Sequence, residues 1–207
     1  MSTTESSPRP VSPDHPDLQK WEARYADPDY RPDPDPVPYL VECCVDLTPG
    51  HALCLAAGSG RNVMFLASRG WQVRAVDISS SGLRHCEQLA IADRFSVETV
   101  QADLTHYELG QREFDLVTMI YYLDTMLFSA IALALRPGGH FLFHTFGRDQ
   151  ARRDWGPSNP NFLACGRQVL SAFDDWQIRH FAENDVERPD GRIESVVQML
   201  ARKPGLA

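Results

Sequence analysis

The chain has 207 residues, 43% of them hydrophobic, which is enough apolar content for the core of one α/β domain. Its net charge is −8 and it has no block of lysines or arginines, so a nucleic-acid partner is not expected. No apolar run reaches the roughly 18 residues needed to span a bilayer, and the N-terminus lacks a signal-peptide pattern. We therefore expect a cytoplasmic protein, monomer or homodimer, that acts on a small molecule and not at a membrane.

Five cysteines are scattered along the chain without a C-x-x-C pair or a zinc-type spacing with histidine. An odd number of cysteines in a cytoplasmic protein favours reduced, structural thiols. No metal site is predicted.

The first 17 residues are rich in Ser, Thr and Pro and are predicted to be disordered, because they have too few apolar side chains to offset the entropy of ordering. Residues 18–25 have helical spacing of Leu18, Trp21 and Tyr25, and the Pro-Asp repeat over 27–38 cannot continue that helix. The rest of the chain, 18–207, is expected to form a single domain.

The most informative segment runs from Leu53 to Asp77. An apolar strand over 53–57 leads into Gly58-Ser59-Gly60, a helix follows as far as Gly70, and a second strand over 71–76 ends at Asp77. Glycines at such a turn let the backbone approach a ligand, and a carboxylate at the next strand tip can accept both hydroxyls of a ribose. The segment predicts a site for an adenosine-containing cofactor.

A dinucleotide site would have a third glycine, in the pattern G-x-G-x-x-G, but that position is Val63. The fingerprint for a pyrophosphate is therefore incomplete. Helix N-terminal amides and one carboxylate would suit a cofactor without a pyrophosphate.

The remaining pattern alternates strands and helices, which predicts a parallel sheet with helices on both faces and ligands at the carboxyl ends of the strands. Ser79-Ser80-Ser81 offers N-caps for a helix over 78–93. Further helices are predicted over 38–45 and 123–135, and residues 168–173 are predicted to be the end of another helix. Further strands are predicted over 96–103, 113–121, 176–181 and 192–202, and a turn followed by a strand over 136–146. Residues 147–161 are predicted to form a loop at the active-site edge of the sheet.

The ordered set of motifs resembles the class I S-adenosylmethionine-dependent methyltransferases of the TehB-like group, which is related to the thiopurine and thiol methyltransferases. The matching segments are 21–25 (WEARY), 60–62 (GRN), 75–79 (AVDIS), 102–104 (ADL), 135–139 (LRPGG), 156–160 (GPSNP) and 199–203 (MLARK). The resemblance covers Trp21 to Lys203 and implies a Rossmann-like seven-stranded sheet whose last strand is antiparallel.

The resemblance also implies S-adenosylmethionine as cofactor, S-adenosylhomocysteine as product, and an N-terminal lid over about 18–38, although an inert extension is the alternative. The adenine amino group is assigned to Asp103 and the ribose to Asp77. The residues expected to contact the cofactor are Trp21, Tyr25, Ala57, Gly58, Ser59, Gly60, Asn62, Asp77, Ile78, Asp103, Leu104, Ile120 and Tyr121.

Two positions depart from the family pattern. Cys54 stands where the family usually has an acidic residue that organises the turn, and Ala56 stands at the first glycine of the usual G-x-G-x-G. An alanine is tolerated at that position if its φ is negative.

Methyl transfer from a sulfonium needs no protonation of the leaving group, so a catalytic base is optional. Tyr121 and His144 are the candidate catalytic residues, with ordinary aromatic packing as the alternative for Tyr121 and a satisfied core histidine as the alternative for His144. Asp124 is expected to cap the helix that follows it.

Tyr122, Arg153 and Arg188 are the candidate substrate contacts, and the arginines near the predicted loops weakly favour an acidic or oxyanionic substrate. The sequence thus predicts a methyltransferase acting on a small-molecule nucleophile. Two alternatives stay open, a nicotinamide-dependent reductase and a cofactor-binding protein without turnover.

Overall fold

A seven-stranded sheet runs through the computed structural model, which describes residues 9–205. The strand order is β3-β2-β1-β4-β5-β7-β6, with β1 to β5 parallel and β7 antiparallel to both of its neighbours. The predicted fold class, including the antiparallel last strand, is confirmed. The strands are β1 His51–Leu55, β2 Gln72–Asp77, β3 Val97–Gln101, β4 Phe114–Ile120, β5 Leu135–Phe146, β6 Gln177–Glu187 and β7 Ile193–Arg202.

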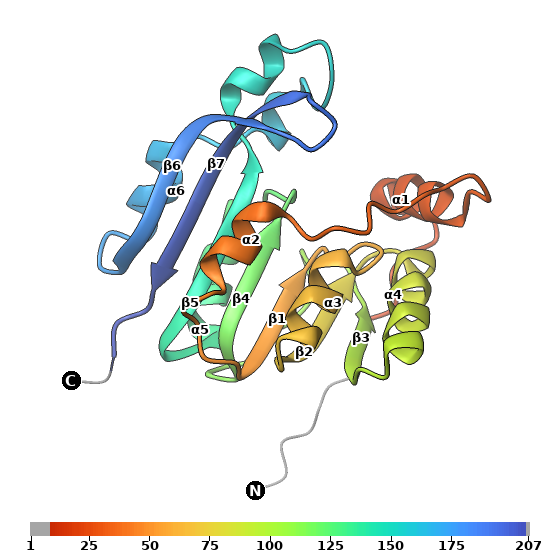
Figure 1. The fold of residues 1–207 in the computed structure, drawn as a ribbon, viewed down its shortest axis with the longest axis horizontal. Helices are drawn as coiled ribbons and strands as arrows, with labels where there is room; N and C mark the ends of the chain where they lie inside the picture. The colour runs from red at the N-terminus through yellow and green to blue at the C-terminus, as the bar shows by residue number, and fades with distance from the viewer. Residues whose placement is uncertain (1–8, 206–207) are drawn as a thin grey trace, which may run out of the picture.

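Helices cover both faces of this sheet, with α2, α3 and α4 on one side and α5 and α6 on the other (Figure 1). Helix α1 lies above α4, and the linker from α1 to α2 passes the carboxyl ends of the strands (Figure 1). The helices are α1 Pro16–Ala26, α2 Pro38–Cys43, α3 Arg61–Ser68, α4 Ser80–Asp93, α5 Phe128–Ala134 and α6 Gly166–Ser171, with short 3₁₀ turns η1 Thr125–Leu127, η2 Arg148–Arg152 and η3 Pro160–Phe162.

The core is divided by the sheet, because successive side chains of a strand point to opposite faces. In β1, Leu53 and Leu55 pack with the α5 and α6 side, whereas Ala52 and Cys54 pack with α2, α3 and α4. All of these side chains are buried. The near-continuous apolar runs of the central strands follow from this two-sided burial.

Three predicted boundaries moved. Helix α1 begins at Pro16, because a proline suits the first helical turn and the His15 side chain accepts a hydrogen bond from the Asp17 backbone N–H. The helix predicted over 123–135 is divided into η1 and α5, and Asp124 caps η1 as expected. The predicted strand over 176–181 continues to Glu187, since its exposed half pairs with β7 and carries little apolar signal.

The disordered segment predicted over 1–17 falls partly on residues 1–8, which lie outside the described residues.

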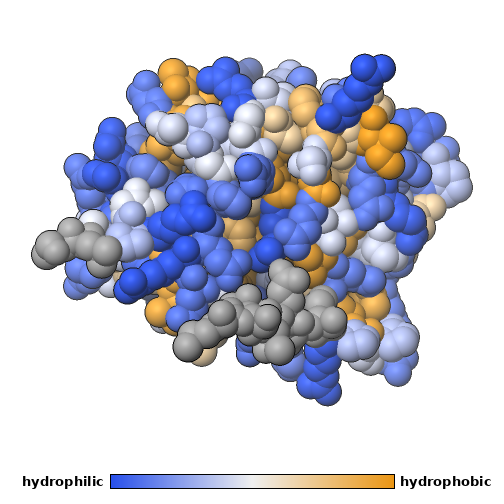
Figure 2. Space-filling view, turned by 90° about the horizontal axis from the view of Figure 1, so that it is seen from below, coloured by the Kyte–Doolittle hydropathy of each residue, from blue (hydrophilic) through white to orange (hydrophobic). Residues whose placement is uncertain are grey.

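All five cysteines are free thiols. Cys54 is buried, and burial raises the pKa of its thiol to about 12. Seen from below, the molecule presents a mostly hydrophilic surface with scattered apolar residues (Figure 2).

Candidate functional site

The turn between β1 and α3 meets the tip of β2 at the carboxyl edge of the sheet. Asp77 ends β2 with only 5% of its surface exposed, and its Oδ2 accepts a hydrogen bond from the Gly58 backbone N–H at 2.7 Å. Its Oδ1 accepts one from the Ser79 N–H at 2.9 Å. Burial raises the pKa of this carboxyl against the lowering effect of the two backbone donors. A carboxylate has about four acceptor positions, so Asp77 retains capacity for two further donors.

The glycines of the turn are required by their geometry. Gly58 and Gly60 have φ of +57° and +94°, in the left-handed region that favours glycine. A Cβ on Gly58 would lie 2.7 Å from the Tyr25 hydroxyl oxygen, and one on Gly60 would lie 2.5 Å from the Cys86 Sγ. At both positions a protein side chain lies where a Cβ would stand, so neither position has room for a larger residue.

Ala56 also has a positive φ, of +53°. The condition under which an alanine would be tolerated at this position, a negative φ, is therefore not met, because the chain leaves β1 at Leu55 and must reverse immediately into the turn. An alanine in the left-handed region is strained by about 1–2 kcal/mol. The turn of this chain thus stores strain that a glycine would not have.

Helix α1 is held against α4 by one carboxylate. The Ser79 Oγ donates to Glu22 Oε2 at 2.6 Å, and the Ser81 backbone N–H donates to the same oxygen at 3.1 Å. Burial alone would raise the pKa of Glu22, but the hydrogen bonds from Ser79, Ser81 and Ser80 lower it to about 2. The serine cluster predicted to cap α4 therefore also binds α1, with Ser79 as the N-cap.

The aromatic side chains of α1 and the segment after it cover the glycine turn. The Tyr25 ring lies beside Gly58 and Gly82, and Trp21 stacks on it with ring centroids 5.8 Å apart. The Tyr30 hydroxyl lies 3.1 Å from the Ser59 Oγ. The aromatic side chains of this segment therefore lie over the glycine turn.

Asp103 follows β3 and lies at the same edge as Asp77. Its Oδ1 accepts hydrogen bonds from the backbone N–H and the hydroxyl of Thr105, and His15 Nε2 lies 3.6 Å from its Oδ2. Burial would raise the pKa of this carboxyl, but the Thr105 donors lower it. Leu104 is buried next to it, and Ile78 is half-buried.

The other predicted cofactor residues divide into two kinds. Ala57 and Ser59 lie in the turn itself, whereas Ile120 is buried at the end of β4. The Asn62 Oδ1 accepts a hydrogen bond from the Val37 N–H at 3.0 Å and so ties the linker before α2 to α3. Asn62 therefore has a structural partner in this fold.

A buried polar network lies beyond the ends of β4 and β5. The Tyr121 hydroxyl donates to both oxygens of Glu194, at 2.8 and 3.0 Å, and an Arg188 Nη1 donates to Glu194 Oε2 at 3.1 Å. Glu194 is 3% exposed, and burial would raise its pKa, but the nearby His144 ring and the hydrogen bond from the Tyr121 hydroxyl lower it. Tyr121 has φ of +54°, a strained value of the kind that gathers at functional sites.

His144 stands behind this network with 2% of its surface exposed. Its Nδ1 lies 3.2 Å from the Gln198 amide nitrogen, and its Nε2 lies 3.7 Å from Glu194 Oε1 with no hydrogen-bond partner. Both ring nitrogens thus face protein groups. The structure brings His144, Tyr121 and Arg188 together around Glu194.

The other two substrate candidates lie apart from that network. Tyr122 is half-buried against the core on the α5 side of the sheet, and Arg153 forms an ion pair with Asp185 of β6 at 2.5 Å. Arg188 is surrounded by acceptors, because Asp33 lies 4.0 Å and Asp190 3.6 Å from its guanidinium. Asp33 also pairs with Arg61 at 2.6 Å, next to the Tyr121 ring.

Glu22, Asp33 and Glu194 are site residues that the sequence interpretation missed. Glu194 gave one local signal, since it is an acidic residue within the strand predicted over 192–202. Asp33 and Glu22 looked like ordinary surface charges.

Within residues 9–205 no group of three or more His, Cys, Asp or Glu side chains could hold a metal ion. Over the same residues, no helix is long and apolar enough to cross a membrane.

Comparison with known proteins finds similarity to methyltransferases. Residues 52–139 match the model of a methyltransferase domain. The chain is 28% identical over 152 residues to a ubiquinone biosynthesis O-methyltransferase of Alkalilimnicola ehrlichii, covering 67% of this chain but only 58% of that enzyme.

Solved structures share the fold at low identity. TehB from Haemophilus influenzae superposes with a TM-score of 0.71 at 17% identity, covering 88% of this chain and 67% of that one. A Haemonchus contortus phosphoethanolamine N-methyltransferase with bound S-adenosylhomocysteine gives a TM-score of 0.62 at 18% identity, covering 80% of this chain and 51% of that one. Residues 52–139 of the chain are therefore similar to a methyltransferase domain, and the fold of the chain is shared with TehB and with a methyltransferase that binds S-adenosylhomocysteine.

Proposed function

We propose that this protein transfers a methyl group from S-adenosylmethionine to a nucleophilic atom of a small molecule. The observation that carries the proposal is Asp77, a buried carboxylate with spare acceptor capacity, beside a turn whose Gly58 and Gly60 leave no room for a Cβ. Two vicinal hydroxyls of a ribose are the donors that such a carboxylate can accept.

The residues around Asp77 fit the rest of that cofactor. Asp103, at the neighbouring strand tip, is an acceptor for an adenine amino group, and the turn offers backbone amides at the start of α3. Trp21 and Tyr25 would exclude water from the site, since they already lie over the turn.

The cofactor supplies an activated methyl group whose leaving thioether needs no proton. The work left to the chain is to hold the acceptor in line with that group and to keep water out. Tyr121 suits the first task, because its hydroxyl is fixed by Glu194 and Arg188 and its backbone follows β4 directly. His144 and Glu194 support Tyr121 from behind.

The network favours positioning over general-base catalysis by His144. A general base needs a ring nitrogen within about 3 Å of the acceptor, directly or through one water. In this structure one nitrogen of His144 faces Gln198 and the other faces Glu194. We accordingly assign Tyr121 to the acceptor and His144 to the orientation of Glu194.

An oxygen nucleophile is the acceptor atom we favour, on the strength of the similarity to the ubiquinone O-methyltransferase. The arginines Arg61 and Arg188, which share Asp33, add a preference for an acceptor carrying an anionic group. Tyr122 and Arg153 lie apart from this network and are left out of the proposed acceptor contacts.

Ligand-induced thermal stabilisation tests the cofactor. S-adenosylhomocysteine should raise the melting temperature of the full chain with a dependence on concentration, whereas NADH should not. Stabilisation by NADH alone would support a reductase instead, although Val63, fully buried where a dinucleotide site has its third glycine, argues against it.

Methyl transfer itself is tested with labelled S-adenosylmethionine and a metabolite extract, followed by mass spectrometry of every molecule that gains the label. Tyr121→Phe should lower kcat/KM for the acceptor found while leaving the affinity for S-adenosylhomocysteine unchanged. Tight cofactor binding without transfer to any acceptor would instead indicate a cofactor-binding protein without turnover.

A further inference from the structure

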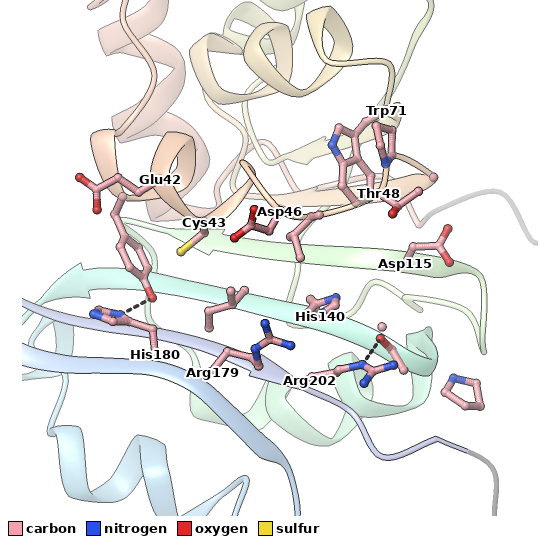
Figure 3. Close-up of a pocket in the computed structure, with 18 residues that line it drawn as sticks. Glu42, Cys43, Asp46, Thr48, Trp71, Asp115, His140, Arg179, His180 and Arg202 are labelled. Carbon is pink, nitrogen blue, oxygen red and sulfur yellow. Dashed lines mark hydrogen bonds between the residues drawn. The ribbon is translucent and has the colours of Figure 1, made fainter.

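A hollow lies at the opposite edge of the sheet from the glycine turn, where the parallel strands begin. We call it the amino-edge groove, and its volume is about 680 Å³. One wall is α2 with the loop that leads to β1, and the other is formed by the starts of β5 and β6 and the end of β7 (Figure 3). Asp77 and the glycine turn do not line it.

The sheet wall of the groove gathers positive charge. His140 of β5 pairs directly with Arg202 of β7, and Arg179 of β6 stands beside them (Figure 3). Burial lowers the pKa of His140, and the charges of Arg202 and Arg179 lower it further. Figure 3 shows both arginines on the same wall of the groove as His140.

These cations have no protein carboxylate to neutralise them. Within residues 9–205, neither Arg179 nor Arg202 forms an ion pair, and the Arg202 Nε donates only to the Gly138 carbonyl, at 3.2 Å. The protein as a whole carries a net charge of −8. A cluster of unpaired arginines is thus a local exception, and like charges at short range repel one another.

The strand that carries Arg179 is distorted where it meets the groove. The pairing of β6 with β7 shifts register between Ile178 and His180. In a regular strand Arg179 and His180 would point to opposite faces of the sheet, yet both line the groove (Figure 3). Irregularities of this kind re-aim side chains and are common beside functional sites.

The helix wall has the opposite charge. Glu42 and Asp46 face the groove from α2 and the residues after it, and neither forms an ion pair in the described part of the chain. Asp115, also in the lining, is already engaged by Arg136 and by the His51 backbone N–H. A ligand with a second anionic group would meet these carboxylates, so the wall selects molecules whose remainder is neutral or cationic.

We propose that the amino-edge groove binds a small molecule with one oxyanion group, carboxylate or phosphate, held by Arg179, Arg202 and His140. Guanidinium groups match both oxyanions with paired N–H donors. The groove is separate from the proposed cofactor and acceptor sites. Its ligand would therefore bind in addition to S-adenosylmethionine and the methyl acceptor.

The test titrates the full chain with inorganic phosphate and, separately, with acetate, while amide and histidine signals are followed by NMR at constant ionic strength set with chloride. We expect saturable shifts at His140 and its neighbours with at least one of the two probes, and which probe binds tells phosphate from carboxylate. Shifts that chloride reproduces equally, or none with either probe, would overturn the proposal.

Variants locate the binding. Arg179→Gln combined with Arg202→Gln should weaken binding at least tenfold, whereas Arg167→Gln, on exposed α6, should leave it unchanged. If the double variant is unstable, Arg179→Gln alone is tested, because the Arg179 side chain forms no ion pair in the described structure that the change could remove. The single change should weaken binding at least threefold. Unchanged affinity in both variants contradicts the assignment.

Discussion

At the carboxyl edge of the sheet, Glu22, Asp77 and Glu194 are each held by two or more hydrogen-bond donors, whereas at the amino edge Arg179 and Arg202 have no carboxylate partner within the described residues. At the first edge these carboxylates have hydrogen-bond partners within the protein, and the aromatic residues of α1 lie over the glycine turn. The second is an open groove with opposed walls. A protein that neutralises one set of charges internally and leaves another set free keeps the second set available to a ligand.

The comparison is tested most strongly at Glu194, the most deeply buried carboxylate of the acceptor side. Glu194→Ala removes the partner of Arg188 and the acceptor of the Tyr121 hydroxyl, and should lower the free energy of unfolding by about 3 kcal/mol. Urea denaturation measures it. Glu187→Ala, on the exposed edge strand, should change stability by less than about 0.5 kcal/mol. Equal effects of the two changes would show that burial of the network is not what stabilises this edge.

The attachment of α1 gives an effect that depends on pH. The pKa of Glu22 is lowered from its ordinary 4.5 to about 2, so its contribution is complete above pH 4.5 and disappears as the pH falls towards 2. The stability difference between the native protein and Glu22→Gln should therefore shrink between pH 5 and pH 3. Urea unfolding across that range measures it, and a difference that stays constant with pH would contradict this role of Glu22.

Strain in the glycine turn predicts a smaller, stabilising change. Ala56→Gly relieves an alanine at φ +53° and should raise the free energy of unfolding by about 1 kcal/mol. Ala57→Gly is the matched control, because its backbone is not in the left-handed region and glycine there should destabilise by about 0.5–1 kcal/mol. Destabilisation by both changes would mean that Ala56 is not strained.

Much of the closed edge could be predicted from the sequence because its parts are consecutive. The strand, the two glycines, the helix and Asp77 lie within one segment, and local spacing alone brings Asp77 to Gly58. The fold followed from the same alternation of strands and helices. The position of the last strand was assigned through the family resemblance.

The acceptor side and the groove depend on contacts between distant parts of the chain, which no local pattern reveals. Glu194 meets Tyr121 only because β7 returns antiparallel to β5, and Asp33 meets Arg61 only because the linker crosses the strand ends. The positive φ of Ala56 left no trace either, since an alanine gives no sign of an unusual backbone. Arg179 faces the groove because the pairing of β6 with β7 is irregular at this residue, and the sequence of β6 does not predict that irregularity.

The most direct test of the proposed function is the affinity of Asp77→Asn for S-adenosylhomocysteine, measured by isothermal titration calorimetry beside the native protein. Replacing the carboxylate removes two charge-assisted hydrogen bonds to the ribose, so the affinity should fall at least about 100-fold, or close to 3 kcal/mol. Asp174→Asn, an exposed change between α6 and β6, should bind like the native protein, and circular dichroism should show that both variants are folded. Affinities within twofold of one another in all three proteins would contradict the assignment of this edge to the cofactor.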